Sequence, residues 1–89
     1  MKLSDDFVLR RVMGQTLLVP VGAQSKTYNG VFTMSETGAF LLDAFAAGDG
    51  VDTAAGKLAA SFDVPPAEAA EDARAFARRL LELGVLLPD

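Results

Sequence analysis

Two different hydrophobic periods divide the chain, and this division limits the fold more than any other feature. Residues 7–34 contain short apolar and β-branched runs separated by turn residues, which is the pattern of β-strands. From Ser35 to Leu83, apolar side chains instead recur every three or four residues, the period of amphipathic helices. A chain of 89 residues has too small an interior for two cores. The sequence therefore predicts a single α+β domain over residues 1–89.

The first strand-forming segment predicts a β-hairpin. Residues 7–21, FVLRRVMGQTLLVPV, contain two apolar runs around Gly14-Gln15, a short turn of the kind that joins antiparallel strands. Pro20 has no N–H to donate to a ladder, so we expect a bulge or a locally unpaired side of the second strand at this position.

A third strand should follow over residues 28–34, YNGVFTM, after a polar turn at residues 22–26. Phe32 and Met34 would share one face of this strand. Gly30 either marks a bulge, which we favour, or allows another backbone to approach closely. Three consecutive strands indicate an antiparallel meander with the third strand at its edge.

Three helices complete the predicted order β3α3. The first begins after Ser35, a natural N-cap, and ends before Gly48. The second covers residues 53–61, with Asp52 or Thr53 placed to cap it, and the third covers residues 66–83 after a Pro-Pro break. The third helix has a predicted core stripe, which consists of Ala69, Ala73, Phe76, Ala77, Leu80 and Leu83. A short strand at residues 85–87 is expected to follow.

The chain contains neither histidine nor cysteine, which argues against an enzyme. These residues supply the usual general base at neutral pH, thiolate nucleophiles and the commonest zinc ligands. The acidic pairs Asp5-Asp6 and Asp49/Asp52 lack the spacing of a catalytic or calcium site. We therefore expect a non-catalytic protein with no metal site and no cofactor.

DNA binding is the main alternative, because a small sheet and short helices are typical of winged helix-turn-helix transcriptional regulators. In that fold the beginning of the recognition helix enters the major groove. Here that end carries Glu68, Glu71 and Asp72, and the whole chain has a formal charge of −4. Acidic side chains repel phosphates, so we expect no nucleic-acid partner. Pairs of Arg74 with Glu71 and of Arg78 with Glu82 would instead be intrahelical.

A second stripe on the third helix indicates a peptide-binding surface. Ala70, Arg74, Ala77, Arg78 and Leu81 lie beside the core stripe and would form a shallow groove. If the third strand lies next to this helix, an extended peptide could add a strand to its free edge. The alternative is that Leu81 completes the core and Ala70 only favours the helix; these residues do not decide between the two interpretations.

A family resemblance favours the peptide-binding interpretation. Residues 29–42, NGVFTMSETGAFLL, resemble a passage of PqqD-like proteins, the recognition elements for precursor peptides that are made on ribosomes and then modified. The opening FVLRRV and LLVPVG, and the later FDV and LGVL, are similar to the same family, so the resemblance covers nearly the whole chain. It implies a winged helix-turn-helix-like β3α3 fold without catalytic activity.

The resemblance also implies a partner and a site. Members bind a leader peptide as an added strand against the third strand and third helix, and present it to a modifying enzyme, often a radical SAM protein. Carried over by position, the peptide-binding residues would be Asn29, Gly30, Val31, Phe32, Thr33, Arg74, Ala77, Arg78 and Leu81. The hairpin resembles relatives from other peptide pathways, so a role in pyrroloquinoline quinone (PQQ) synthesis is left open.

The sequence also suggests a location and an oligomeric state. There is no stretch of about 18 apolar residues, and the opening MKLSDDF lacks the apolar run of a signal peptide. We therefore expect a cytoplasmic protein with no membrane partner. The exposed edge of the third strand could also pair with a second copy, which would make a homodimer that covers the predicted site.

Overall fold

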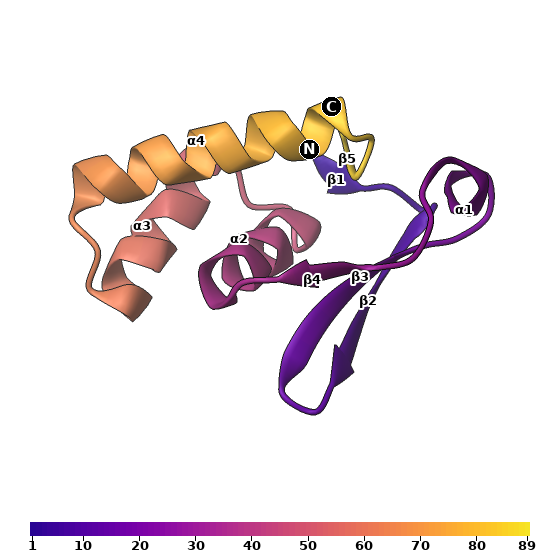
Figure 1. The fold of residues 1–89 in the computed structure, drawn as a ribbon. Helices are drawn as coiled ribbons and strands as arrows, with labels where there is room; N and C mark the ends of the chain where they lie inside the picture. Colours follow the sequence, from indigo (N-terminus) through magenta and orange to yellow (C-terminus); the bar gives the residue numbers. More distant parts are fainter.

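A computed structural model of residues 1–89 shows a small antiparallel sheet with three long helices on one side of it (Figure 1). Along the chain the elements are β1 (Lys2–Leu3), β2 (Phe7–Val12), β3 (Gln15–Pro20), α1 (Gln24–Thr27), β4 (Phe32–Met34), α2 (Glu36–Ala46), α3 (Val51–Phe62), α4 (Pro66–Glu82) and β5 (Leu86–Leu87). The main sheet has the order β2-β3-β4, so the predicted meander followed by three helices is confirmed.

The hairpin turns one residue earlier than predicted. Val12 pairs with Gln15, so the two loop residues are Met13 and Gly14 rather than Gly14-Gln15. Their φ angles are 51° and 80°, and a type I′ turn requires positive φ at both positions. At the other end of β3, the pairing with β4 stops at Leu18, so Pro20 lies where β3 is unpaired on that side.

The segment before β4 differs from the prediction. Residues 24–27 form one helical turn, α1, where a plain turn was expected. β4 begins only at Phe32, so residues 28–31 are not part of the strand. Gly30 has φ of 87°, and nothing lies within 4 Å of the position that its Cβ would occupy. Gly30 therefore supplies a left-handed bend before the strand, and neither a bulge within it nor a close backbone approach.

Tyr28 fixes this segment against the end of α4. Its hydroxyl donates a hydrogen bond to the backbone carbonyl of Leu83 at 2.8 Å. Its ring packs between Phe7 and Phe32, with centroid distances of 5.9 and 5.4 Å. These contacts hold the approach to β4 in place without strand pairing.

The three helices begin and end close to the predicted positions. Ser35 caps α2 as predicted, because its Oγ accepts a hydrogen bond from the Gly38 amide at 3.1 Å. The N-cap of α3 is Gly50, without a side-chain bond, so the predicted cap at Asp52 or Thr53 is wrong. None of the helices has both the length and the apolar character needed to cross a membrane.

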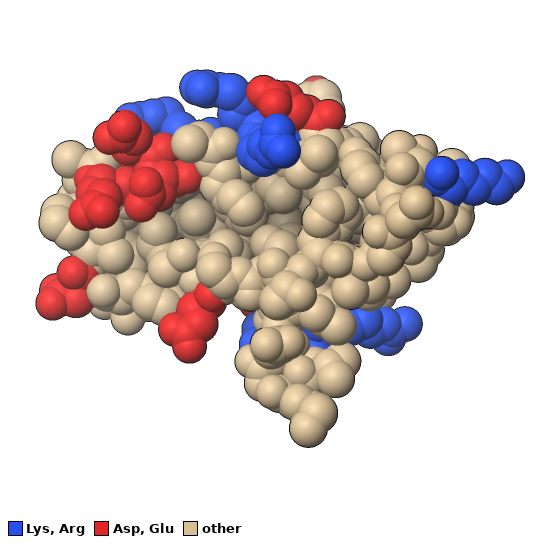
Figure 2. All heavy atoms as spheres, in the orientation of Figure 1, with Lys and Arg blue, Asp and Glu red and all other residues tan.

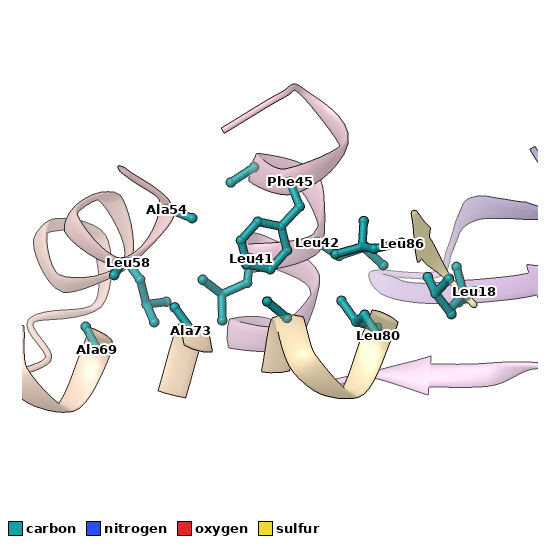
Figure 3. Packing of buried hydrophobic residues seen from close by; sticks show 14 of the residues in the cluster. Leu18, Leu41, Leu42, Phe45, Ala54, Leu58, Ala69, Ala73, Leu80 and Leu86 are labelled. Carbon is teal, nitrogen blue, oxygen red and sulfur yellow. The ribbon is translucent and has the colours of Figure 1, made fainter. Parts of the chain in front are cut away.

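The core lies between the helices and the inner face of the sheet. Small side chains of α4 allow it to approach α3, as Figure 3 shows for Ala69 and Ala73 beside Leu58. Leu80, Leu86 and Leu18 continue the apolar cluster from α4 to β5 and the sheet (Figure 3). The largest fully buried side chains are those of Phe45, Leu42, Leu58, Leu86 and Val85.

The two ends of the chain pair with each other. The predicted strand after α4 is β5, and it pairs antiparallel with β1 through Lys2↔Leu87 and Leu3↔Leu86. The sequence did not predict β1, because a two-residue strand carries too little pattern to recognise. This second small sheet lies beside the end of α4 (Figure 1).

Candidate functional site

One edge of the main sheet is free beside α4. β4 pairs with β3 on one side only, and its other side has no strand partner. Unpaired backbone groups at a sheet edge form a template for a further strand. Figure 1 shows β4 ending beside α2, with the second half of α4 above them, and residues of both β4 and α4 line one hollow. A segment added to β4 would therefore also contact α4.

A groove runs between β4 and α4 and continues over the beginning of α2. It consists of two hollows, of about 360 and 410 Å³, and both are lined by Ser35, Gly38, Phe76 and Arg79. Because these residues are shared, the hollows join into one surface, which we call the β4–α4 groove. The volumes fall in the range of about 300–1,000 Å³ that is typical of ligand sites.

The end of the groove beside β4 is mainly apolar. Its walls come from the inner face of the sheet and from one flank of α4, and its apolar lining consists of Leu18, Phe32, Met34, Phe76, Leu80, Leu83 and Val85. Phe32, Met34, Phe76 and Leu83 are only half-buried, so part of their surface is open to a ligand. This end of the groove can bury apolar side chains, which would gain about 25 cal/mol per Å² of apolar surface removed from water.

Gly38 keeps the floor of the groove open. A Cβ at this position would lie 3.0 Å from Ser35 Oγ, 3.4 Å from Phe76 Cζ and 3.6 Å from Met34 Cε. Ser35 and Phe76 line both hollows, so Gly38 lies where the two hollows meet. A larger residue here would fill the groove and press on the α2 cap at the same time.

Charge varies along the groove. Asp72 lies in the hollow near the beginning of α4, whereas Arg79 belongs to both hollows. The side chain of Arg79 is 68% exposed, and its only ion-pair contact, with Glu82, is a weak one at 4.0 Å. The guanidinium is therefore free to bind an anionic group of a ligand. Figure 2 shows acidic atoms around the beginning of α4 and basic atoms along its second half. An elongated ligand would therefore meet opposite charges at different points.

The predicted strand residues of the site divide into two groups. Phe32 and Thr33 belong to β4 and line the groove. Asn29, Gly30 and Val31 precede the strand and are exposed outside the groove lining. Their part in binding stays a prediction.

The predicted helix residues lie on the other flank of α4. Neither Arg74, Ala77, Arg78 nor Leu81 lines the groove. Ala77 is buried in the core, Leu81 is half-buried against it, and the two arginines are exposed. The expected pairs of Arg74 with Glu71 and of Arg78 with Glu82 are also absent, and the α4 ion pair is Arg79–Glu82.

The groove is lined on α4 by Phe76 and Leu83, which belong to the predicted core stripe, and by Arg79, which belongs to neither predicted stripe. Together with Asp72 they recur at intervals of three and four, the signature of one helix flank. Both flanks of the core stripe carry apolar and basic residues, so the sequence alone did not show which flank faces the sheet.

A third hollow, of about 540 Å³, lies between the hairpin and α2. Arg11 and Asp43 contribute to its walls and form an ion pair at 3.0 Å across it. It offers less free strand edge than the β4–α4 groove, because Met34 is its only residue from β4. No group of three or more acidic side chains that could hold a metal ion is present.

The fold and the groove define a small winged-helix-like domain that exposes a strand edge beside a helix. Two solved structures share this fold with TM-scores of 0.80: TbiB1 in complex with the TbiA(beta) leader peptide, and a lasso peptide synthetase B1 complexed with the leader peptide. The first is 20% identical and is covered completely, as is this chain. The second is 18% identical, over 98% of this chain and 96% of that one. A comparison of the sequence with curated proteins finds no match.

The sequence itself identifies the family. Residues 15–86 match the family model described as coenzyme PQQ synthesis protein D (PqqD), and these residues include β3, β4, all the helices and the first residue of β5. The chain therefore belongs to the PqqD family, as the resemblance at residues 29–42 had indicated.

Proposed function

We propose that this protein is a non-catalytic recognition element, which binds the leader of a ribosomally made precursor peptide and presents it to a modifying enzyme. The observation that carries the proposal is the free edge of β4 at the β4–α4 groove. An extended peptide can bond its main chain to such an edge and place alternate side chains in a neighbouring pocket. The family membership supports the proposal, and two proteins of the same fold were solved with leader peptides.

The groove indicates what kind of leader would fit. Apolar side chains would enter the end lined by Phe32, Phe76 and Leu83. A carboxylate of the peptide would lie near Arg79, and a basic side chain would fit near Asp72. We therefore expect a leader with apolar residues that flank an acidic one.

Presentation rather than catalysis suits the chemistry of the chain. Without histidine or cysteine, the groove offers no usual nucleophile or neutral-pH base. The modifying enzyme would supply the reaction, and a radical SAM protein is the candidate that the resemblance suggests.

We place this partnership in the cytoplasm, where precursor peptides are synthesised. The family's name points to PQQ synthesis and the related folds to lasso peptides, so the proposal covers the leader-binding step alone.

The charge distribution does not favour the DNA-binding alternative. The first turns of α4 carry Glu68, Glu71 and Asp72, which would face the phosphates if this helix entered a major groove. A DNA complex would also weaken steeply with added salt. Fluorescence anisotropy with a labelled DNA duplex at two salt concentrations tests for DNA binding directly. Tight, salt-sensitive binding would support the DNA-binding alternative.

A leader-peptide titration with two matched charge reversals tests the proposal. The probe is a synthetic leader of the precursor encoded beside this protein's gene, and the readout is amide NMR together with calorimetry. We expect shifts at Thr33, Phe76 and Arg79. Arg79→Glu should weaken binding about tenfold through loss of an ionic contact, whereas Arg78→Glu on the opposite flank should have little effect.

The reverse result would return the site to the predicted flank. If Arg78→Glu and Leu81→Ala weaken binding while Arg79→Glu does not, the peptide lies on the other side of α4. No shift anywhere in β4 or α4 would refute the proposal. Sedimentation with and without peptide tests the predicted homodimer, because a dimer through the β4 edge should dissociate when peptide occupies that edge.

A further inference from the structure

The outer face of the sheet carries the half-buried aliphatic side chains of Val8, Leu17 and Val19, and none of the three long helices packs over them. Along β3, Thr16, Leu18 and Pro20 are buried, so the alternate residues Leu17 and Val19 point away from the helices. The register adds their cross-strand neighbours to the same side. This outer face consists of Val8, Arg10, Val12, Gln15, Leu17, Val19 and Thr33.

The side assignment has an independent check. Arg11 follows Arg10 in β2, so its side chain must point to the opposite face. It forms its ion pair with Asp43 of α2, on the helix side of the sheet. Arg10 therefore points outward, to the face opposite the Arg11–Asp43 ion pair.

The apolar surface continues to the tip of the hairpin. Val12 is 48% exposed and Met13, in the turn, is 98% exposed. Figure 2 shows that the end of the projecting hairpin is free of charged atoms in this view. A strand with one face in water usually alternates apolar residues on the buried face with polar residues on the solvent face. β3 carries aliphatic residues on both faces, which indicates a contact surface on the outer one.

The charge and the area of this face select the kind of partner. Arg10 is its only charged residue, and two copies packed face to face would bring like charges together. Three strands about 4.8 Å apart and about six residues long give an area of only about 300 Å². A stable interface needs about 800 Å² per partner, so this face alone cannot hold a dimer. It fits a larger protein that presents an aliphatic surface with a carboxylate and also contacts neighbouring parts of the domain.

We propose that the outer face of the sheet docks the enzyme that modifies the bound peptide, an inference that rests on the proposed function. β4 belongs both to this face, through Thr33, and to the β4–α4 groove. A peptide added to β4 as a fourth strand would extend the outer face and turn alternate side chains toward the same enzyme. The enzyme therefore binds the loaded protein more tightly than the empty one.

The test measures two affinities for each variant: leader peptide for the protein, and the purified modifying enzyme encoded beside this gene for the peptide-loaded protein. Val19→Lys places a charge on the outer face, opposite Val8, and Ala60→Lys places the same charge on the exposed surface of α3 as a control. We expect Val19→Lys to weaken enzyme binding at least about tenfold and to leave peptide binding within about twofold. The control should bind both like the original protein.

A second variant, Arg10→Glu, should not disturb folding, because Arg10 is exposed and makes no ion pair. Arg10→Glu should also weaken enzyme binding about tenfold without changing peptide affinity or the thermal unfolding curve. Enzyme binding unchanged by both variants would overturn the inference, as would a dimer that Val19→Lys dissociates. Failure of the original protein to bind the leader would instead refute the proposed function.

Discussion

Apolar side chains are mostly buried in the helical body, whereas several of those in the hairpin are exposed. Phe45 and Leu42 in α2 have no exposed surface, whereas Val12 and Met13 in the hairpin are 48% and 98% exposed. The body buries its largest side chains among the alanines of α3 and α4. The hairpin contributes only one face to that core. The contrast indicates that stability resides in the helical body and that the sheet is left available for contacts with other molecules.

The strongest test of this contrast is Phe45→Ala. Removing a fully buried phenylalanine should lower the free energy of unfolding by about 3–5 kcal/mol, because it leaves a cavity in addition to losing apolar burial. Met13→Ala at the hairpin tip should change it by less than about 0.5 kcal/mol. Urea denaturation followed by circular dichroism measures both. Similar losses for the two variants would remove the distinction between body and hairpin.

A smaller effect is expected where the sheet passes into the body. Ser35→Ala removes the cap at the beginning of α2, and should lower the free energy of unfolding by about 1 kcal/mol and at most about 2. Ser61→Ala, at an exposed position in the last turn of α3, provides the matched control. The same urea experiment applies, and equal midpoints for the two variants would show that the cap contributes nothing.

Tyr28→Phe should have a comparable or slightly smaller effect. The substitution keeps the ring between Phe7 and Phe32 and deletes only the hydrogen bond to the Leu83 carbonyl. We expect a loss of about 0.5–1 kcal/mol in the free energy of unfolding, measured by thermal denaturation. Hydrogen exchange should also increase for the amides of residues 28–32. Unchanged exchange there would mean that the ring contacts alone hold the segment.

The smallest effect concerns the one ion pair between the hairpin and α2. Arg11 and Asp43 are 71% and 48% exposed, so solvent screens their attraction. A double-mutant cycle with Arg11→Ala and Asp43→Ala should give a coupling energy of about 0.2–0.5 kcal/mol, which decreases with added salt. A coupling above about 1 kcal/mol would show that the hairpin is fixed to the body more firmly than the contrast implies.

Local pattern predicted most of the fold. The alternation around Gly14 specified the hairpin, and helical periodicity with Ser35 and Pro66 at helix starts specified α2 and α4. Residues 24–31 could not be predicted in this way. Tyr28, between the helical turn and the bend at Gly30, is anchored to Leu83 by a contact across 55 residues, which leaves no local sequence pattern.

Of the predicted site residues, Phe32 and Thr33 lie on the strand that borders the groove, and the α4 residues lie outside its lining. Which of them bind peptide stays a prediction. On α4, the pattern of Arg74 and Arg78 resembles that of Arg79 on the other flank, and both flanks border the same buried stripe. Only the packing of α4 against the sheet decides between them, and that packing is a tertiary property.

The pairing of β1 with β5 has a consequence for how the chain can be rearranged. Lys2 lies opposite Leu87, and Met1 contacts the side chain of Asp89, so residues 1 and 89 lie side by side. A short linker could join residue 89 to residue 1, and new ends could be opened at Met13-Gly14. Such a circular permutant would keep the groove intact while it cuts the hairpin tip. The domain is thus built as a nearly closed loop of chain.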